Sequence, residues 1–167
     1  MNIKKLKMGM IGGGPGSFIG GIHRNAAALD GLITLSAGSF SSHAEKSKIL
    51  GKELSIPTER IYSSYDEMFE REINLPPKDR IDFVSIITPN HLHFDPTLKA
   101  INNGFHVVLD KPMTLNLEEA RKLHAAIKDS GLLFCLTHTY TGYPMIKEAK
   151  QLIAKGVLGE IRKIYVE

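Results

Sequence analysis

The residues with the clearest chemical potential are the glycines that follow the first apolar stretch of the chain. Between Lys7 and Ser17 the sequence reads KMGMIGGGPGS, so an apolar run leads directly into a glycine-rich loop. When such a loop joins a strand to a helix, backbone N–H groups can face a phosphate with no side chain in the way. The spacing predicts a site for a dinucleotide pyrophosphate; the alternative interpretation is an ordinary turn after a strand.

Five positions of this loop carry the prediction. We expect Gly12 to allow the tight turn and Gly14 to allow the close approach of a phosphate. Pro15 and Gly16 stiffen and reshape the loop. Ser17 stands at the third glycine position of the G-x-G-x-x-G pattern, where its small side chain would permit close packing of the helix on the strand.

The elements that must position this loop alternate along the chain. We expect strands at residues 6–11, 32–40, 81–88, 105–109 and 132–137, and helices at residues 18–29, 43–51, 65–72, 91–102, 116–131 and 144–155. This alternation predicts an α/β fold with a doubly wound parallel sheet, the Rossmann fold. Since ligands bind at the carboxyl ends of such strands, residues that directly follow a strand are candidate site residues.

Composition narrows the classes of partner. The 167 residues are 43% hydrophobic but contain no apolar run long enough to span a bilayer, so we expect no membrane association. The formal net charge is only +3 and the lysines are scattered, which makes nucleic acid an unsuitable partner. With no signal segment and one cysteine, Cys135, which we expect to be buried in a strand, the sequence favours a cytoplasmic location.

Four blocks of sequence in this order resemble one known family. They are the glycine loop, ITPNHLH from Ile87 to His93, the triplet Asp110-Lys111-Pro112, and GVLGEI from Gly156 to Ile161. Together they resemble the N-terminal half of the Gfo/Idh/MocA family, named after glucose-fructose oxidoreductase and inositol dehydrogenase, over nearly the whole chain. The resemblance implies a dehydrogenase that transfers hydride between NAD or NADP and a small-molecule sugar, cyclitol or related polyol.

The resemblance also implies a division of the chain. Residues 1–140 would be the NAD(P)-binding Rossmann domain. Residues 141–167 would be a linking helix and the first strand of a truncated C-terminal α/β domain, because residues 161–167 alternate like the opening of a strand. In the family this second domain supplies substrate contacts and forms homo-oligomers, so we expect the fragment to be inactive alone.

The catalytic candidates fall on Asp110 and Lys111. The family carries Glu-Lys-Pro here, with the lysine beside the nicotinamide and the reacting hydroxyl, which makes Lys111 a candidate for cofactor and substrate contact as well. A cation at the carboxyl end of a parallel strand could polarise a carbonyl or stabilise an alkoxide. Asp110 replaces the usual Glu and would orient the lysine; the alternative is that Lys111 is a surface residue before a proline turn.

The block after the third long strand supplies further candidates. Thr88, Pro89, Asn90 and His93 match the family's segment under the nicotinamide and its ribose. Asn90 could instead serve only as the N-cap of the following helix. Because His91 and His93 are two residues apart and so lie on different helical faces, we expect no metal site.

The choice between NAD and NADP depends on the end of the second strand. NAD-specific Rossmann folds usually place an Asp or Glu there for the ribose hydroxyls, but this chain has Ser41 and Ser42. His43 and Lys46 follow closely enough to approach a 2′-phosphate. We therefore favour NADP slightly over NAD.

A polar and aromatic segment follows the last strand. His138, Tyr140 and Tyr143 are candidates for substrate contact, and aromatic packing under the second domain is the alternative interpretation. Two other functions use the same fold: a non-catalytic dinucleotide sensor, and an assembly protein that binds no nucleotide. Lys111 argues against the first, and the glycines argue against the second.

Overall fold

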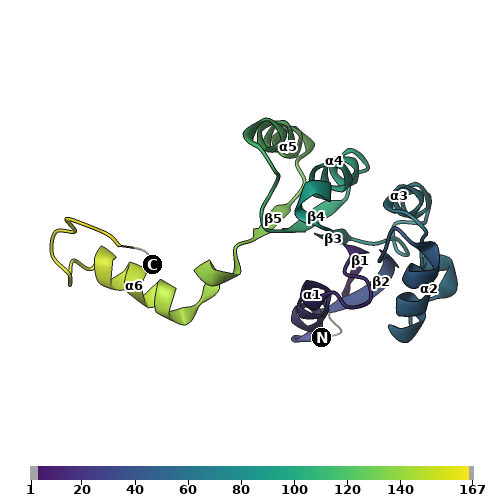
Figure 1. Ribbon diagram of the computed structural model, residues 1–167, viewed down its shortest axis with the longest axis horizontal. Helices are drawn as coiled ribbons and strands as arrows, with labels where there is room; N and C mark the ends of the chain where they lie inside the picture. The colour runs from purple at the N-terminus through teal and green to yellow at the C-terminus, as the bar shows by residue number, and fades with distance from the viewer. Residues whose placement is uncertain (1–3, 166–167) are drawn as a thin grey trace. The chain divides into compact units, whose positions relative to one another are not determined.

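The computed structural model describes residues 4–165, which divide into two compact units between Leu136 and Thr137. The first unit is built on a five-stranded sheet in the order β2-β1-β3-β4-β5 (Figure 1). The strands are β1 (Leu6–Gly12), β2 (Ile33–Ser39), β3 (Phe83–Ile87), β4 (His106–Asp110) and β5 (Phe134–Thr137). β1 pairs in parallel with β2 and β3, and β3 pairs in parallel with β4. The predicted parallel α/β fold is confirmed.

Helices cover both faces of this sheet. They are α1 (Phe18–Ala28), α2 (Ala44–Glu53), α3 (Tyr65–Ile73), α4 (Phe94–Asn102) and α5 (Leu117–Ser130), with short 3-10 helices η1 (Thr58–Arg60) and η2 (Asn90–Leu92). From β1 the chain passes to β2 at one edge of the sheet, and from β2 it returns past β1 to β3, β4 and then β5 at the other edge. Because such crossovers are right-handed, α1 lies on the face opposite α4 and α5 (Figure 1).

The two faces of β1 belong to two hydrophobic clusters. Met8 and Met10 pack with Phe40 and Leu50 on the side that includes residues of α1 and α2. Ile11 belongs to the cluster on the opposite side, which α3, α4 and α5 complete. This division follows from the alternation of side chains along a strand.

Helix boundaries agree with local capping signals. Ser64 caps α3 by accepting a hydrogen bond from the backbone N–H of Glu67 at 3.1 Å. Asn116 caps α5 in the same way through Glu119 at 2.9 Å, and Gly131 ends that helix with φ 68°. These caps place the loops that connect the strands to the helices.

Cys135 corrects one expectation. The cysteine is exposed on β5, although its apolar surroundings predicted burial. Phe134 and Leu136 pack against the core, and since successive side chains of a strand point to opposite faces, Cys135 points away from it.

The second unit contains η3 (Thr139–Gly142) and α6 (Pro144–Ala154). Its start at Thr137 precedes the domain boundary expected after residue 140. The strand predicted for residues 161–167 is not formed over 161–165, and residues 166–167 lie outside the described part of the chain. A strand requires a hydrogen-bonded neighbour, and residues 161–165 pair with no other described segment. No helix in the described residues is both long and apolar enough to cross a membrane.

Candidate functional site

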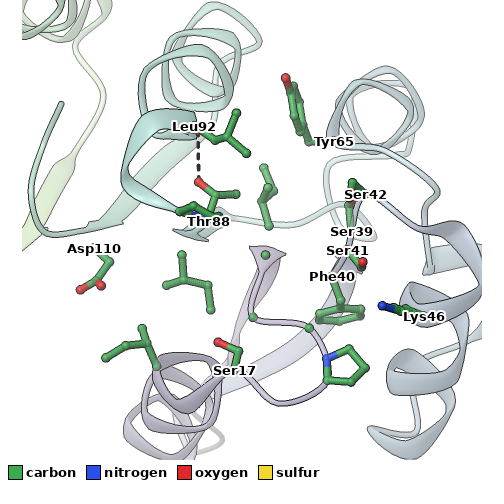
Figure 2. Close-up of a pocket in the computed structure, with 18 of the residues that line it drawn as sticks. Ser17, Ser39, Phe40, Ser41, Ser42, Lys46, Tyr65, Thr88, Leu92 and Asp110 are labelled. Carbon is green, nitrogen blue, oxygen red and sulfur yellow. Dashed lines mark hydrogen bonds between the residues drawn. The ribbon is translucent and has the colours of Figure 1, made fainter. Parts of the chain in front are cut away.

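The carboxyl ends of the strands border a cavity of about 940 Å³ in the first unit (Figure 2). The residues predicted from sequence that line it are Gly12, Gly14, Pro15, Gly16, Ser17, Ser41, Ser42, Lys46, Thr88, Pro89, Asn90, Asp110 and Lys111. Residues far apart in the sequence therefore meet in one space, at the position where open parallel sheets bind ligands.

The glycine loop forms its tight turn at the end of β1. Gly12 has φ 85°, and a Cβ atom there would stand 2.8 Å from the carbonyl oxygen of Ile87. A Cβ atom on Gly14 would stand 2.6 Å from the carbonyl oxygen of Phe40. The absence of a side chain at Gly14 thus lets the loop pack against the end of β2. The sequence alone explains this glycine only by the close approach of a phosphate.

Ser17 has a different role from the one predicted. It is the N-cap of α1, and its Oγ accepts a hydrogen bond from the backbone N–H of Gly20 at 3.1 Å. The close approach of the helix is made instead by Gly20, which meets Gly13. The first turn of α1 has no acidic residue, so its positive dipole end is available to an anion.

The end of β2 carries no carboxylate. Ser39, Ser41 and Ser42 line the cavity there together with the cation Lys46 (Figure 2). Ser47 fixes this corner from α2, because its Oγ accepts from the N–H of Phe40 at 3.0 Å and donates to the carbonyl of Tyr62 at 3.1 Å.

His43 and Lys46, although both were predicted to approach a phosphate, have different positions. His43 is exposed at the N-cap position of α2 and does not line the cavity. Its backbone N–H donates a hydrogen bond to Oγ of Ser41 at 3.1 Å. Lys46 lies one turn farther along and does line it.

The segment after β3 is held by its own hydrogen bonds. Thr88 donates through Oγ1 to the carbonyl of Leu92 at 3.1 Å (Figure 2). Asn90 begins η2 rather than capping a long helix, because α4 starts only at Phe94. Its exposed side chain is therefore not used as the N-cap that the alternative interpretation expected.

His93 is buried beneath this segment, with 1% of its surface exposed, and it does not line the cavity. Its Nε2 lies 2.9 Å from the carbonyl oxygen of Thr88 and its Nδ1 lies 2.6 Å from that of Pro112. The imidazole thereby connects the loop after β3 with the loop after β4.

Asp110 ends β4 and Lys111 follows it, and both line the cavity. The partly buried Asp110 lies at the opposite end of the cavity view from Lys46 (Figure 2). Oδ1 of Asp110 is 3.7 Å from Nε2 of His23 on α1. Asp110 and the exposed Lys111, consecutive in the sequence, thus contribute a carboxylate and a cation to the lining of the cavity.

The sequence interpretation missed the wall between β2 and α3. Ser63, Ser64, Tyr65 and Asp66 line the cavity there, along with the apolar Leu92 across from them. A parallel bridge between Ile61 and Gly38 places the residues after Ile61 beside the end of β2, and this long-range contact is not visible in the sequence pattern.

Tyr65 is fixed in this wall. Its hydroxyl donates to Oδ2 of Asp95 at 2.6 Å, and this hydrogen bond, together with partial burial, raises the pKa of Tyr65 to about 12. Asp66 and Asp95 both pair with Lys99, at 2.8 and 3.0 Å. Among residues 4–165 no group of three or more His, Cys, Asp or Glu side chains could hold a metal ion.

Comparison with known proteins agrees with this geometry. Residues 6–151 match the family model described as "Oxidoreductase family, NAD-binding Rossmann fold", the model of Gfo/Idh/MocA proteins. The chain belongs to the Gfo/Idh/MocA oxidoreductase family. The expected family and its Rossmann domain are therefore confirmed.

Three Gfo/Idh/MocA relatives illustrate the similarity. An uncharacterized oxidoreductase of Bacillus subtilis, YfiI, is 33% identical over 96% of this chain and 41% of its own length. The inositol dehydrogenase homolog of Azotobacter vinelandii, solved with NADH and myo-inositol, is 38% identical with a TM-score of 0.91, over 95% of this chain and 41% of that one. The scyllo-inositol 2-dehydrogenase (NADP(+)) of Bacillus subtilis is 35% identical over 52% of this chain and 24% of its own length.

The chain spans about two-fifths of the length of the first two of these relatives. The remaining predicted residues of this Gfo/Idh/MocA chain lie in the unit that begins at Thr137. Tyr140 and Tyr143 are exposed and meet edge to face with ring centroids 5.7 Å apart, and His138 is also exposed. Their assignment to the substrate remains a prediction.

Proposed function

We propose that this chain is the cofactor-binding part of an NAD(P)-dependent dehydrogenase that transfers hydride between nicotinamide and a sugar, cyclitol or related polyol. One observation supports this most strongly: a single cavity runs from the glycine loop to Asp110 and Lys111. The loop supplies a cradle that a Cβ atom would close, and the far end supplies groups suited to a reacting hydroxyl.

The nucleotide preference proposed is NADP over NAD. At the end of β2 a carboxylate would repel a 2′-phosphate, whereas Ser41 and Ser42 can donate hydrogen bonds to it. Lys46 adds the positive charge that such a phosphate requires, and of the two residues predicted to approach the phosphate it is the one that lines the cavity.

Lys111 is proposed as the catalytic cation and Asp110 as its orienting partner. Nicotinamide, when bound, supplies the hydride acceptor or donor at its ring. The ammonium of Lys111 can stabilise negative charge on the substrate oxygen, and the adjacent carboxylate restricts where that ammonium lies. Thr88, Pro89 and Asn90 form the neighbouring wall of the cavity.

Substrate contact by His138, Tyr140 and Tyr143 is part of the same proposal. These side chains combine hydrogen-bonding groups with flat apolar surfaces, which suits the alternating hydroxyls and C–H faces of a polyol ring. The relatives named above for inositol substrates support the substrate class.

The test uses Lys111→Ala in the full-length protein, assayed with NADP⁺ or NAD⁺ against a panel of myo-inositol, scyllo-inositol and D-glucose. We expect the variant to bind nucleotide normally but to lose turnover. Lys122→Ala on α5, where the lysine is exposed and pairs with Glu118 at 2.7 Å, is the matched control and should retain activity. Undiminished turnover by Lys111→Ala would contradict the proposed role.

A further inference from the structure

His23 contacts a residue of the proposed active site, Asp110, without lining the cavity itself. It lies on α1, and its ring is directed at the sheet, with a side chain only 12% exposed. Nδ1 is 3.0 Å from Oγ of Ser85 on β3, and Nε2 is 3.7 Å from Oδ1 of Asp110 at the end of β4. Ser85 is itself 1% exposed, so one contact of the ring is fixed in the core.

These contacts connect three elements at one point. α1 begins at the glycine loop, and the same helix reaches Asp110 through His23. In the sheet Ser85 pairs with Met10 of β1 and with Val108 of β4, two residues before Asp110. His23 therefore connects the end of β4 with α1, the helix that begins at the glycine loop bordering the cavity.

We infer that His23 is a positioning residue that fixes the carboxylate of Asp110 and, through it, the placement of Lys111. The inference rests on the proposed function for its catalytic consequence. His23 does not line the cavity, so it would act through Asp110 and not by touching the substrate or the nucleotide.

The charge of the ring decides how it acts. Burial lowers the pKa of His23, and the neighbouring Asp110 carboxylate opposes this shift without overcoming it. Near neutral pH the imidazole is therefore uncharged and carries one N–H. The arrangement that suits both partners has the Ser85 hydroxyl donating to Nδ1 and the Nε2–H facing the carboxylate.

Few other charged groups face this ring. On α1 the neighbouring Arg24 donates to the carbonyl of Gly13 at 3.1 Å. β2, which α1 also covers, has no ionisable side chain, and the contact from β3 is the hydroxyl of Ser85. From β4 the charged group is Asp110, with Lys111 following it in sequence. Protonation of His23 would therefore act mainly on Asp110.

The expected consequence is that turnover decreases at acidic pH. Below its pKa the ring becomes a cation and pairs with the Asp110 carboxylate, which offsets the negative charge next to Lys111 in the sequence. Turnover should then fall with decreasing pH, and the midpoint of this fall should follow the pKa of His23.

The structural link can be measured without any turnover. Histidine ring signals of the chain are followed by NMR through a pH titration, with His23 assigned by the variant His23→Gln. We expect the pKa of His23 to lie below its ordinary value of 6.5, and to fall further in Asp110→Asn because the opposing carboxylate charge is lost. An unchanged His23 pKa in Asp110→Asn would overturn the link.

The catalytic consequence is tested by pH profiles of NADP⁺ reduction with myo-inositol in the full-length protein. His23→Gln keeps a donor toward Asp110 but cannot titrate, so it should retain most of the plateau rate and lose the acidic limb. His23→Leu should lower kcat by between about 10-fold and 100-fold at every pH, because Asp110 is no longer held. His124→Gln on α5 is the control with an unchanged profile.

The outcomes separate the two proposals. An acidic limb that persists in His23→Gln would overturn the positioning role even if the enzyme is active. Absence of turnover in the wild-type protein with every substrate of the panel would overturn the proposed function and with it the catalytic consequence, whereas the NMR titration would still decide whether His23 and Asp110 are coupled.

Discussion

Gly20 on α1 lies so close to Gly13 of the glycine loop that a Cβ atom on Gly20 would stand 2.7 Å from both the Cα and the carbonyl oxygen of Gly13. Arg24, one turn later on the helix, donates to the same carbonyl at 3.1 Å. The N-terminal part of α1 is thus packed directly on the loop that borders the cavity. The position of the helix and the shape of the loop depend on each other.

Gly20→Ala should therefore damage both stability and nucleotide binding. The added methyl group must push α1 away from the loop, and overpacking of this kind costs about 1–3 kcal/mol of unfolding free energy. Gly21→Ala is the matched control, because a Cβ atom there meets nothing within 4 Å and alanine favours the helix. Urea denaturation and calorimetry with NADPH would check both variants, and equal behaviour of the two would contradict the packing argument.

Lys46→Ala should weaken binding of NADPH more than binding of NADH. Lys46 lines the cavity at the end of β2, where only NADPH carries a 2′-phosphate. Since the lysine is exposed, the expected loss of NADPH affinity is modest, about threefold to tenfold, and should shrink at high salt.

Lys48→Ala provides the comparison for this variant. Lys48 lies on the same helix, but it is paired with Glu45 at 3.0 Å and does not line the cavity. It should leave the ratio of the two affinities unchanged. Equal losses for both nucleotides in Lys46→Ala would argue against a 2′-phosphate contact.

Glu72→Gln should destabilise the fold strongly. Glu72 is fully buried and accepts hydrogen bonds from Arg60 through Nε and Nη2, both at 2.7 Å, from the hydroxyl of Tyr62 at 2.7 Å, and from the N–H of Ile81 at 3.0 Å. Removing one charge of a buried pair typically costs about 3–5 kcal/mol. The exposed Glu70→Gln on the same helix should leave the unfolding free energy nearly unchanged in urea denaturation. A loss below about 1 kcal/mol in Glu72→Gln would refute this role.

The raised pKa of Tyr65 predicts that the folded chain loses stability at alkaline pH. Its pKa is about 12 in the folded chain, mainly because its hydroxyl donates to Asp95, and about 10 when unfolded. The unfolded state therefore releases the proton first, so the contribution is complete below pH 10 and disappears as the pH rises toward 12. Tyr65→Phe should show a shallower decline over this range than the wild type, and Tyr140→Phe, at an exposed position, should follow the wild type. Parallel curves for wild type and Tyr65→Phe would exclude the effect.

The sequence predicted the sheet well because strands and helices differ in period. The apolar run 81–88 and the glycine loop after residue 11 place β3 and β1 with no tertiary information, and the ends of these strands locate the site. The caps at Ser17 and Asn116 depend on neighbours within a few residues. Ser17 was nevertheless assigned another role, because only the packing of α1 shows that Gly20 makes the close contact.

Features that depend on distant contacts were not predictable in this way. The burial of His93 depends on two carbonyls from loops after different strands, and the exposure of Cys135 depends on which face of β5 is covered. The wall at Tyr65 depends on the bridge between Ile61 and Gly38. A predicted strand at residues 161–167 failed over 161–165, because alternation supplies no pairing partner.

The most direct measurement is calorimetric titration of the folded chain with NADPH and with NADH in one buffer, alongside the variant Gly12→Val. The cavity predicts saturable binding of one nucleotide per chain, tighter for NADPH, and loss of that binding when a side chain at Gly12 meets the backbone of Ile87 and Thr88. Tighter binding of NADH would reverse only the proposed preference. Absence of saturable binding by either nucleotide, in a chain shown to be folded by circular dichroism, would contradict the assignment of this cavity to the cofactor.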